Sequence, residues 1–160
     1  MKLKEILLTV IAVCTIVSAY FSYSSYKTLD AIAGGNAQAT QSKETITKKY
    51  AKKQTYAKAQ ETGKPMVVFF YADWCGYCKR FAPVFHSVVK KREFKKNLAV
   101  AYVNCDAPDN TALVKEYGIQ GFPTVYMVSK DGTKTVVNNS ELFAPDAKET
   151  LLAKFLKFAQ

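Results

Sequence analysis

The sequence predicts an α/β domain in which helices cover a central β-sheet, preceded by an apolar N-terminal segment. Residues 66–71 (MVVFFY) form a continuous apolar run, which is typical of a strand buried on both faces of a sheet. Helical spacing follows at once, with apolar residues at i, i+3, i+4, i+7 and i+8 between Phe81 and Val89. Further strand-like runs at 98–104 and 124–128 alternate with helical patterns.

Residues 1–26 predict a signal peptide or a signal-anchor transmembrane segment. Two lysines precede a run of 21 uncharged residues, 6–26, which is long enough to span a bilayer as a helix. Residues 17–19 (VSA) would serve as a cleavage site, whereas the aromatic residues between 20 and 26 would form an interfacial belt; we favour the uncleaved anchor. The basic N-terminus stays inside, so the rest is exported. In a bacterial-type cell the domain would face the periplasm from the inner membrane, or be secreted after cleavage.

Residues 27–42 predict a linker, because the stretch is small, polar and contains glycine. The folded domain is expected over 43–160. Residues 43–61 contain helix formers and no proline, which predicts an N-terminal helix, and 63–65 (GKP) ends it before the core at 64–160.

Two cysteines, Cys75 and Cys78, lie where the predicted strand gives way to the predicted helix. Cys75 falls at the helix N-terminus, where unpaired backbone N–H groups and the positive end of the helix dipole favour a thiolate. Cys78 lies one turn further on the same side, so it is placed to attack a mixed disulfide formed on Cys75. The pattern predicts a reactive pair in which Cys75 attacks and Cys78 resolves.

Three other interpretations of this pair are weaker. A tetrahedral zinc site needs two more ligands, yet no second CxxC follows and the only histidine is His86 on the same helix, so we predict no metal. Haem attachment requires histidine directly after the second cysteine, where Lys79 stands. A purely structural disulfide closing so small a loop would constrain the unfolded chain little.

The remaining elements follow from turn and capping signals. The strand 98–104 ends at Cys105, which is expected to be a buried or half-buried free thiol, with a regulatory disulfide as the minor alternative. Residues 108–110 (PDN) cap a short helix that Gly118 ends. An Asp-Gly turn joins strands 124–128 and 133–137, and Pro145 begins a terminal helix with an apolar stripe.

Four segments together resemble the thioredoxin superfamily over about 64–160. Residues 74–79 (WCGYCK) look like its WCxxCK active site, Pro83 matches its helix-kinking proline, 118–124 (GIQGFPT) is similar to its cis-proline segment, and 130–132 (KDG) matches its final hairpin turn. The resemblance implies a thioredoxin-like fold with a mixed sheet, a redox-active Cys75–Cys78 disulfide and a cis Pro123. It also implies a substrate groove built from Trp74, Gly76, Tyr77, Phe122 and Pro123.

The chain departs from the superfamily pattern in three places. Phe69 replaces a buried carboxylate and Tyr102 aligns with its usual lysine partner, so a proposed proton relay for Cys78 is missing. Asp73 is a weak substitute. The dipeptide Gly-Tyr between the cysteines resembles that of bacterial periplasmic disulfide isomerases, which leaves the direction open between reductase and isomerase, with oxidase less favoured. Residues 138–144 replace a glycine after the last strand, so the groove is expected to differ in shape.

The net charge of +10 at pH 7 does not indicate a nucleic-acid partner, because the lysines are spread over several helices and no aromatic-basic motif accompanies them. We predict a thiol–disulfide oxidoreductase that acts on protein disulfides outside the cytoplasm and is reset by a thiol redox partner. No cofactor is expected, because the cysteine pair stores the electrons. The alternative is a non-catalytic peptide-binding or chaperone module with the same groove.

Overall fold

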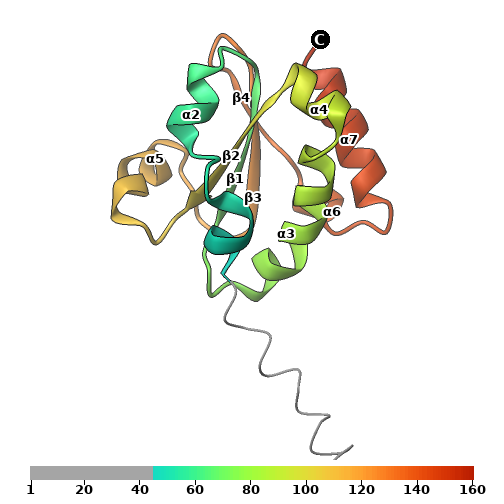
Figure 1. The fold of residues 1–160 in the computed structure, drawn as a ribbon. Helices are drawn as coiled ribbons and strands as arrows, with labels where there is room; N and C mark the ends of the chain where they lie inside the picture. The colour runs from blue at the N-terminus through green and yellow to red at the C-terminus, as the bar shows by residue number, and fades with distance from the viewer. Residues whose placement is uncertain (1–44) are drawn as a thin grey trace, which may run out of the picture. The chain divides into compact units, whose positions relative to one another are not determined.

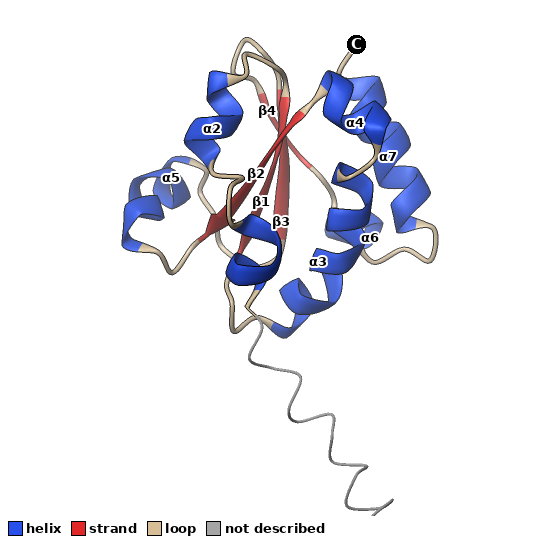
Figure 2. Ribbon diagram, viewed as in Figure 1, coloured by secondary structure: helices blue, strands red, loops and turns tan. Residues whose placement is uncertain are grey.

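The computed structural model describes residues 45–160, which fold around a four-stranded mixed sheet (Figures 1 and 2). The strand order is β2-β1-β3-β4, with bounds β1 Met66–Tyr71, β2 Ala99–Asn104, β3 Thr124–Val128 and β4 Lys134–Val136. β1 runs parallel to β2 and antiparallel to β3, and β3 pairs antiparallel with β4. The expected thioredoxin-like α/β fold with a central mixed sheet is confirmed.

Helices cover both faces of the sheet, as Figure 1 shows. One face carries α3 (Gly76–Val89), α4 (Arg92–Asn97), α6 (Asn139–Leu142) and α7 (Ala147–Phe158). The other face carries α2 (Tyr56–Glu61) and α5 (Thr111–Glu116), the latter preceded by the 3-10 turn η4 (Pro108–Asn110). Because a parallel β1–β2 pair needs a crossover connection, α3 and α4 lie between these two strands in the chain.

β1 is the central strand, and all six of its residues are buried. Its side chains alternate between the faces, so Val67, Phe69 and Tyr71 join the core beneath α3 and α7. Met66, Val68 and Phe70 join the smaller core beneath α2 and α5. The continuous apolar run in the sequence therefore reflects a strand with no solvent-facing side, as predicted.

The predicted apolar stripe of α3 packs against the sheet. Phe81, Phe85, Val88 and Val89 are buried, whereas Val84 is half-buried. The terminal helix α7 begins at Ala147, two residues later than Pro145, and buries Leu151 and Phe155 through the same kind of stripe. These two helices lie against one another and hold the start of α3 at one end of the sheet.

The prediction of one N-terminal helix over 43–61 is wrong for the part that the structure describes. A short π-helix, η3 (Thr47–Ala51), is followed by a break at 52–55 and then by α2. The break forms because the backbone carbonyl of Gln54 accepts a hydrogen bond of 2.8 Å from the N–H of Tyr102, which draws the chain alongside β2. The Thr55 side chain then caps α2 by accepting from the N–H of Lys58. Tertiary pairing therefore overrides local helix propensity here.

The predicted signal or anchor segment at 1–26, the whole predicted linker at 27–42, and residues 43–44 of the predicted N-terminal helix lie outside the described residues. Over 45–160, no helix combines the length and the apolar character needed to cross a membrane.

Candidate active site

Cys75 lies at the N-terminus of α3, directly beyond the carboxyl end of β1. It is the N-cap residue, and its Sγ accepts a hydrogen bond of 3.1 Å from the backbone N–H of Cys78. Its own N–H donates to the carbonyl of Ala72 at 3.1 Å, which fixes the loop between strand and helix. The geometry matches the predicted position of the nucleophile, because an N–H directed at sulfur stabilises a thiolate.

Cys78 lies one turn deeper and is fully buried, whereas Cys75 keeps 6% of its surface exposed. Burial raises the pKa of the Cys78 thiol well above its ordinary value, a hydrogen bond with Cys75 adds to this effect, and the backbone of Ala72 opposes it. Both residues are free thiols in the structure. The two thiols therefore differ in exposure: Cys75 keeps a small accessible surface, and Cys78 has none.

A cis peptide bond between Phe122 and Pro123 lies beside Cys75, so the cis proline implied by the resemblance is confirmed. The Cys75 thiol lies 3.8 Å from the carbonyl oxygen of Phe122 and donates to it. The Phe122 ring meets the edge of Trp74 at a centroid distance of 6.1 Å, and Trp74 is 68% exposed. These contacts link Cys75 to Phe122 and Phe122 to Trp74, three residues that the sequence predicted to lie together.

Gly76 and Tyr77 form the first turn of α3 on the exposed side of Cys75. A Cβ at Gly76 would meet no atom within 4 Å, so the fold itself does not require glycine there. Tyr77 is 61% exposed and contacts Phe143, at 5.9 Å between ring centroids. Phe143 was missed by the sequence reasoning, which expected only a changed shape for 138–144. Motif spacing could not find it, because it reaches Tyr77 from the loop between α6 and α7.

An aromatic cluster around Phe69 occupies the position where the superfamily pattern has a buried carboxylate. Phe69 is fully buried and pairs in register with Tyr102 on β2, so the two departures from the superfamily pattern are neighbours in the sheet. The ring of Phe69 also contacts those of Phe81, Phe85 and Tyr71. Within 45–160 no charged side chain is buried, so this cluster contains no carboxylate that could accept the Cys78 proton.

Asp73 is held in a hydrogen-bond network at the mouth of the site. Its carboxylate accepts from the N–H of Thr47 at 3.1 Å, from the Thr47 hydroxyl at 2.8 Å and from the Asn104 amide at 3.3 Å. Thr47 also hydrogen-bonds the buried hydroxyl of Tyr71 at 2.8 Å. Burial raises the pKa of Tyr71 to about 12, and the Thr47 hydrogen bond opposes this shift. The network ties η3 to the loop before Cys75, and the sequence reasoning named only Asp73 among its members.

His86 lies apart from the cysteines, on the opposite half of α3. Its Nδ1 is 3.3 Å from the Tyr102 hydroxyl, and its ring lies 4.7 Å from that of Tyr50. Partial burial lowers the pKa of His86, and the nearby Lys90 and Lys95 lower it further. The side chain is therefore half-buried and packs against Tyr50 and Tyr102. In the part of the chain that the structure describes, no group of three or more His, Cys, Asp or Glu residues is arranged to hold a metal ion.

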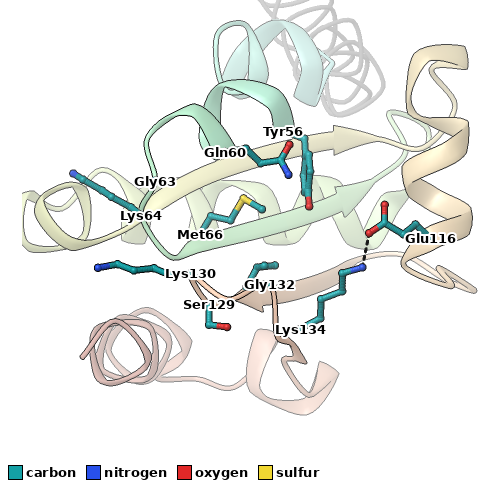
Figure 3. Close-up of a pocket in the computed structure, with 11 residues that line it drawn as sticks. Tyr56, Gln60, Gly63, Lys64, Met66, Glu116, Ser129, Lys130, Gly132 and Lys134 are labelled. Carbon is teal, nitrogen blue, oxygen red and sulfur yellow. Dashed lines mark hydrogen bonds and ion pairs between the residues drawn. The ribbon is translucent and has the colours of Figure 1, made fainter.

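A cavity of about 410 Å³ lies at the other end of the sheet from Cys75 (Figure 3). It is lined by Met66, the first residue of β1, and by residues of α2 and of the turn between β3 and β4, including Tyr56 and Gly132. Figure 3 shows the side chains of Lys64 and Lys130 extending away from Tyr56. The Lys64 ammonium instead donates to the carbonyls of Lys95 and Lys96. No cysteine lines this cavity, so it is not part of the candidate active site.

Cys105 provides an internal reference for cysteine reactivity. It is half-buried, as expected, and burial raises its pKa to about 11. Iodoacetamide reacts with thiolates, so at pH 7 Cys105 is expected to react at least about tenfold more slowly than Cys75, and its rate is expected to rise until the pH approaches 11. Mass spectrometry of the peptides containing each cysteine measures both rates in one sample. Equal rates at pH 7 would contradict the assignment of Cys75 as the reactive thiol.

A family model described as Thioredoxin matches residues 45–156. Protein disulfide-isomerase 1 of Dictyostelium discoideum is 39% identical over 77 residues, covering 46% of this chain and 21% of that protein. Protein disulfide-isomerase A4 of Homo sapiens is 38% identical over 74 residues, covering 46% of this chain and 11% of that protein. The chain thus matches less than a quarter of the length of either relative.

Solved structures agree on the fold. A thioredoxin of Malassezia sympodialis superposes with a TM-score of 0.51 at 25% identity, covering 67% of this chain and 90% of that one. The J-Trx1 fragment of ERdj5 superposes with a TM-score of 0.52 at 23% identity, covering 65% of this chain and 46% of that one, and supports the fold alone. Since the family model spans more than half of the residues, and the sheet and cis proline agree with it, the chain belongs to the thioredoxin family.

Proposed function

We propose that this protein is a thiol–disulfide oxidoreductase that reduces or isomerises protein disulfides through Cys75 and Cys78. The observation that carries the proposal is the position of Cys75: its sulfur accepts the N–H of Cys78 at 3.1 Å and lies 3.8 Å from the carbonyl of Phe122, beside the cis Pro123. A helix N-terminus thus supports a thiolate next to a backbone segment that could bind an extended peptide.

The chemistry proceeds in two exchanges. The Cys75 thiolate attacks one sulfur of the substrate disulfide, which forms a mixed disulfide and releases the other substrate sulfur as a thiolate. Cys78 then loses its proton and attacks the Cys75 sulfur, which forms the Cys75–Cys78 disulfide and releases the second substrate thiol. One substrate disulfide is reduced for each pair of protein thiols oxidised.

The second exchange depends on removing the proton of Cys78. Burial raises the pKa of this thiol, and the aromatic cluster around Phe69 offers no base. The substrate thiolate released in the first exchange is a base formed at the site itself, and bulk solvent is another. We therefore propose that resolution relies on the leaving substrate group or on solvent rather than on a buried carboxylate.

The proposal is tested by insulin reduction with the purified full-length chain and dithiothreitol as the recycling reductant. Turbidity from the released insulin B chain is expected to develop faster than with dithiothreitol alone. A chain carrying Cys75→Ser and Cys78→Ala should give only the dithiothreitol rate, and equal rates for this variant and the wild type would refute the proposal. The reduction potential then decides direction, since about −270 mV favours a reductase and about −120 mV an oxidase.

A second candidate is a peptide-binding module in which the cysteines take no part. The exposed side chains of Trp74 and Tyr77, together with the half-buried Phe122, favour it, because such aromatic surfaces also hold peptides without chemistry. The insulin assay separates the two: the binding module would give no acceleration, and its peptide affinity would not change when both cysteines are replaced.

We also propose that the domain acts outside the cytoplasm, tethered by residues 1–26 and separated from the membrane by the linker 27–42, with a thiol redox partner that resets the cysteines. The support is the uncharged run 6–26 behind a basic start. Alkaline extraction of membranes from cells that express the full chain should leave it in the pellet. Recovery in the soluble fraction without loss of mass would refute the tether.

A further inference from the structure

An exposed cluster of two rings and one guanidinium borders the cysteine site. We call Tyr77, Arg80 and Phe143 the Arg80 patch. Arg80 is exposed, and its guanidinium carbon lies 5.4 Å from the centroid of the Tyr77 ring and 5.9 Å from that of Phe143. The two rings lie at 73° to one another and are 61% and 40% exposed, respectively. Stacking on rings restrains a guanidinium while leaving its in-plane N–H donors available.

The positive charge of Arg80 is not neutralised by a neighbouring carboxylate. Helix α3 contains no acidic residue, and two acidic residues of the adjoining segments, Glu141 and Asp73, are engaged elsewhere. Glu141, two residues before Phe143, accepts from the Lys154 ammonium at 2.7 and 2.6 Å. Asp73 is held by Thr47. Among the residues that the structure describes, Arg80 forms no ion pair, so a restrained cation faces solvent beside two apolar surfaces.

The patch lies within reach of a peptide bound at Cys75. Tyr77 and Arg80 are three residues apart, so they share one face of α3. Arg80 follows Cys75 by five residues, an axial rise of about 7.5 Å at about 1.5 Å per residue. An extended peptide covers that distance in about two residues at about 3.4 Å each. Measured along the helix axis, the patch therefore lies about two extended residues from Cys75, which is the spacing that the proposal uses.

We propose that the Arg80 patch selects disulfides with an acidic residue about two positions from the attacked cysteine and an aromatic or aliphatic residue next to it. The carboxylate would bind the Arg80 guanidinium, and the apolar side chain would lie against Tyr77 and Phe143. The proposal rests on the proposed oxidoreductase function and gives that function a substrate class. It differs from the groove around Trp74 and Pro123, which recognises backbone and shape rather than charge.

The test uses peptides joined by a disulfide to a fluorescent reporter, identical except for Glu, Gln or Lys two positions from the cysteine and Phe beside it. Second-order rate constants are measured with the pre-reduced full-length chain. The Glu peptide is expected to react about fivefold faster than the Lys peptide, and the ratio is expected to fall toward one in about 1 M salt. Arg80→Gln should remove the preference and Arg80→Glu should reverse it.

Two controls separate this proposal from the proposed function. Lys130→Gln removes the same charge near the distant cavity and should keep the preference. Hydroxyethyl disulfide carries neither feature, and its rate measures basal exchange in the wild type and in Lys130→Gln, which should be equal. An unchanged Glu-to-Lys ratio in Arg80→Gln would overturn the charge selection while leaving the oxidoreductase function intact. No reaction of the wild type with hydroxyethyl disulfide would overturn that function.

Phe143→Ala tests the apolar contact. It should lower the rate with the Phe peptide but not with a peptide that carries Ala in place of Phe, and equal effects on both would refute the contact.

Discussion

Replacing Cys78 with alanine is expected to lower insulin reduction by at least about 100-fold while substrate proteins accumulate as covalent adducts of Cys75. The first exchange needs only Cys75, which is the cysteine a substrate can reach, so it still proceeds. The second exchange then lacks its nucleophile, because the other described cysteine, Cys105, lies beyond the end of β2 and not in α3. Non-reducing electrophoresis, with and without dithiothreitol, measures the adducts directly.

Two control variants, which change the other cysteines, test whether the adducts form on Cys75. Cys105→Ala should turn over like the wild type, and combining Cys78→Ala with Cys75→Ser should give no adducts. Adducts that persist in the double variant, or that require Cys105, would show that another thiol is the nucleophile and would contradict the proposed roles of the pair.

Replacing Phe69 with alanine is expected to lower the free energy of unfolding by about 3–5 kcal/mol. Phe69 is fully buried in the central strand, and its ring contacts four others. Truncation therefore leaves a cavity between β1 and α3 that rigid neighbouring rings fill poorly. Urea unfolding followed by circular dichroism gives the difference. Val136→Ala, at a 55% exposed position of β4, is the control and should change stability by less than about 0.5 kcal/mol.

The variant Phe69→Asp extends this experiment to the missing carboxylate. It should be less stable than Phe69→Ala, because the new carboxylate would be buried opposite Tyr102, where no positive charge compensates it. Equal stability of the two variants would mean that the cluster admits water or a counterion. In that case the aromatic packing would not explain why this chain lacks the buried charge pair of its superfamily.

The core of the fold was predictable because its signals are local. The uninterrupted apolar run of β1 and the stripe from Phe81 to Val89 each require only neighbouring residues to be recognised. The two cysteines were placed by their position at the boundary between these patterns. The cis bond before Pro123, in contrast, was expected only from the resemblance, since spacing alone carries no information on peptide isomers.

The features that escaped prediction depend on contacts between distant parts of the chain. The break at 52–55 exists because Gln54 hydrogen-bonds Tyr102, 48 positions later, and helix propensity does not report such a partner. The link from Thr47 to Asp73 spans 26 positions. Phe143 reaches Tyr77 only because α6 and α7 return to the same end of the sheet. These contacts depend on the topology of the fold, which local sequence patterns do not reveal.

The hydrogen bond between Gln54 and Tyr102 also bears on how copies of the domain behave in a crowded solution. β2 is an edge strand of the sheet, and the segment before α2 covers part of its free edge through the hydrogen bond from Tyr102 to Gln54. The opposite border is β4, which is only three residues long. Exposed edge strands act as templates for intermolecular β-pairing, and short or covered edge strands suppress it. The architecture thus protects the lysine-rich domain from aggregating through its sheet, while the rings of Trp74 and Tyr77 stay exposed.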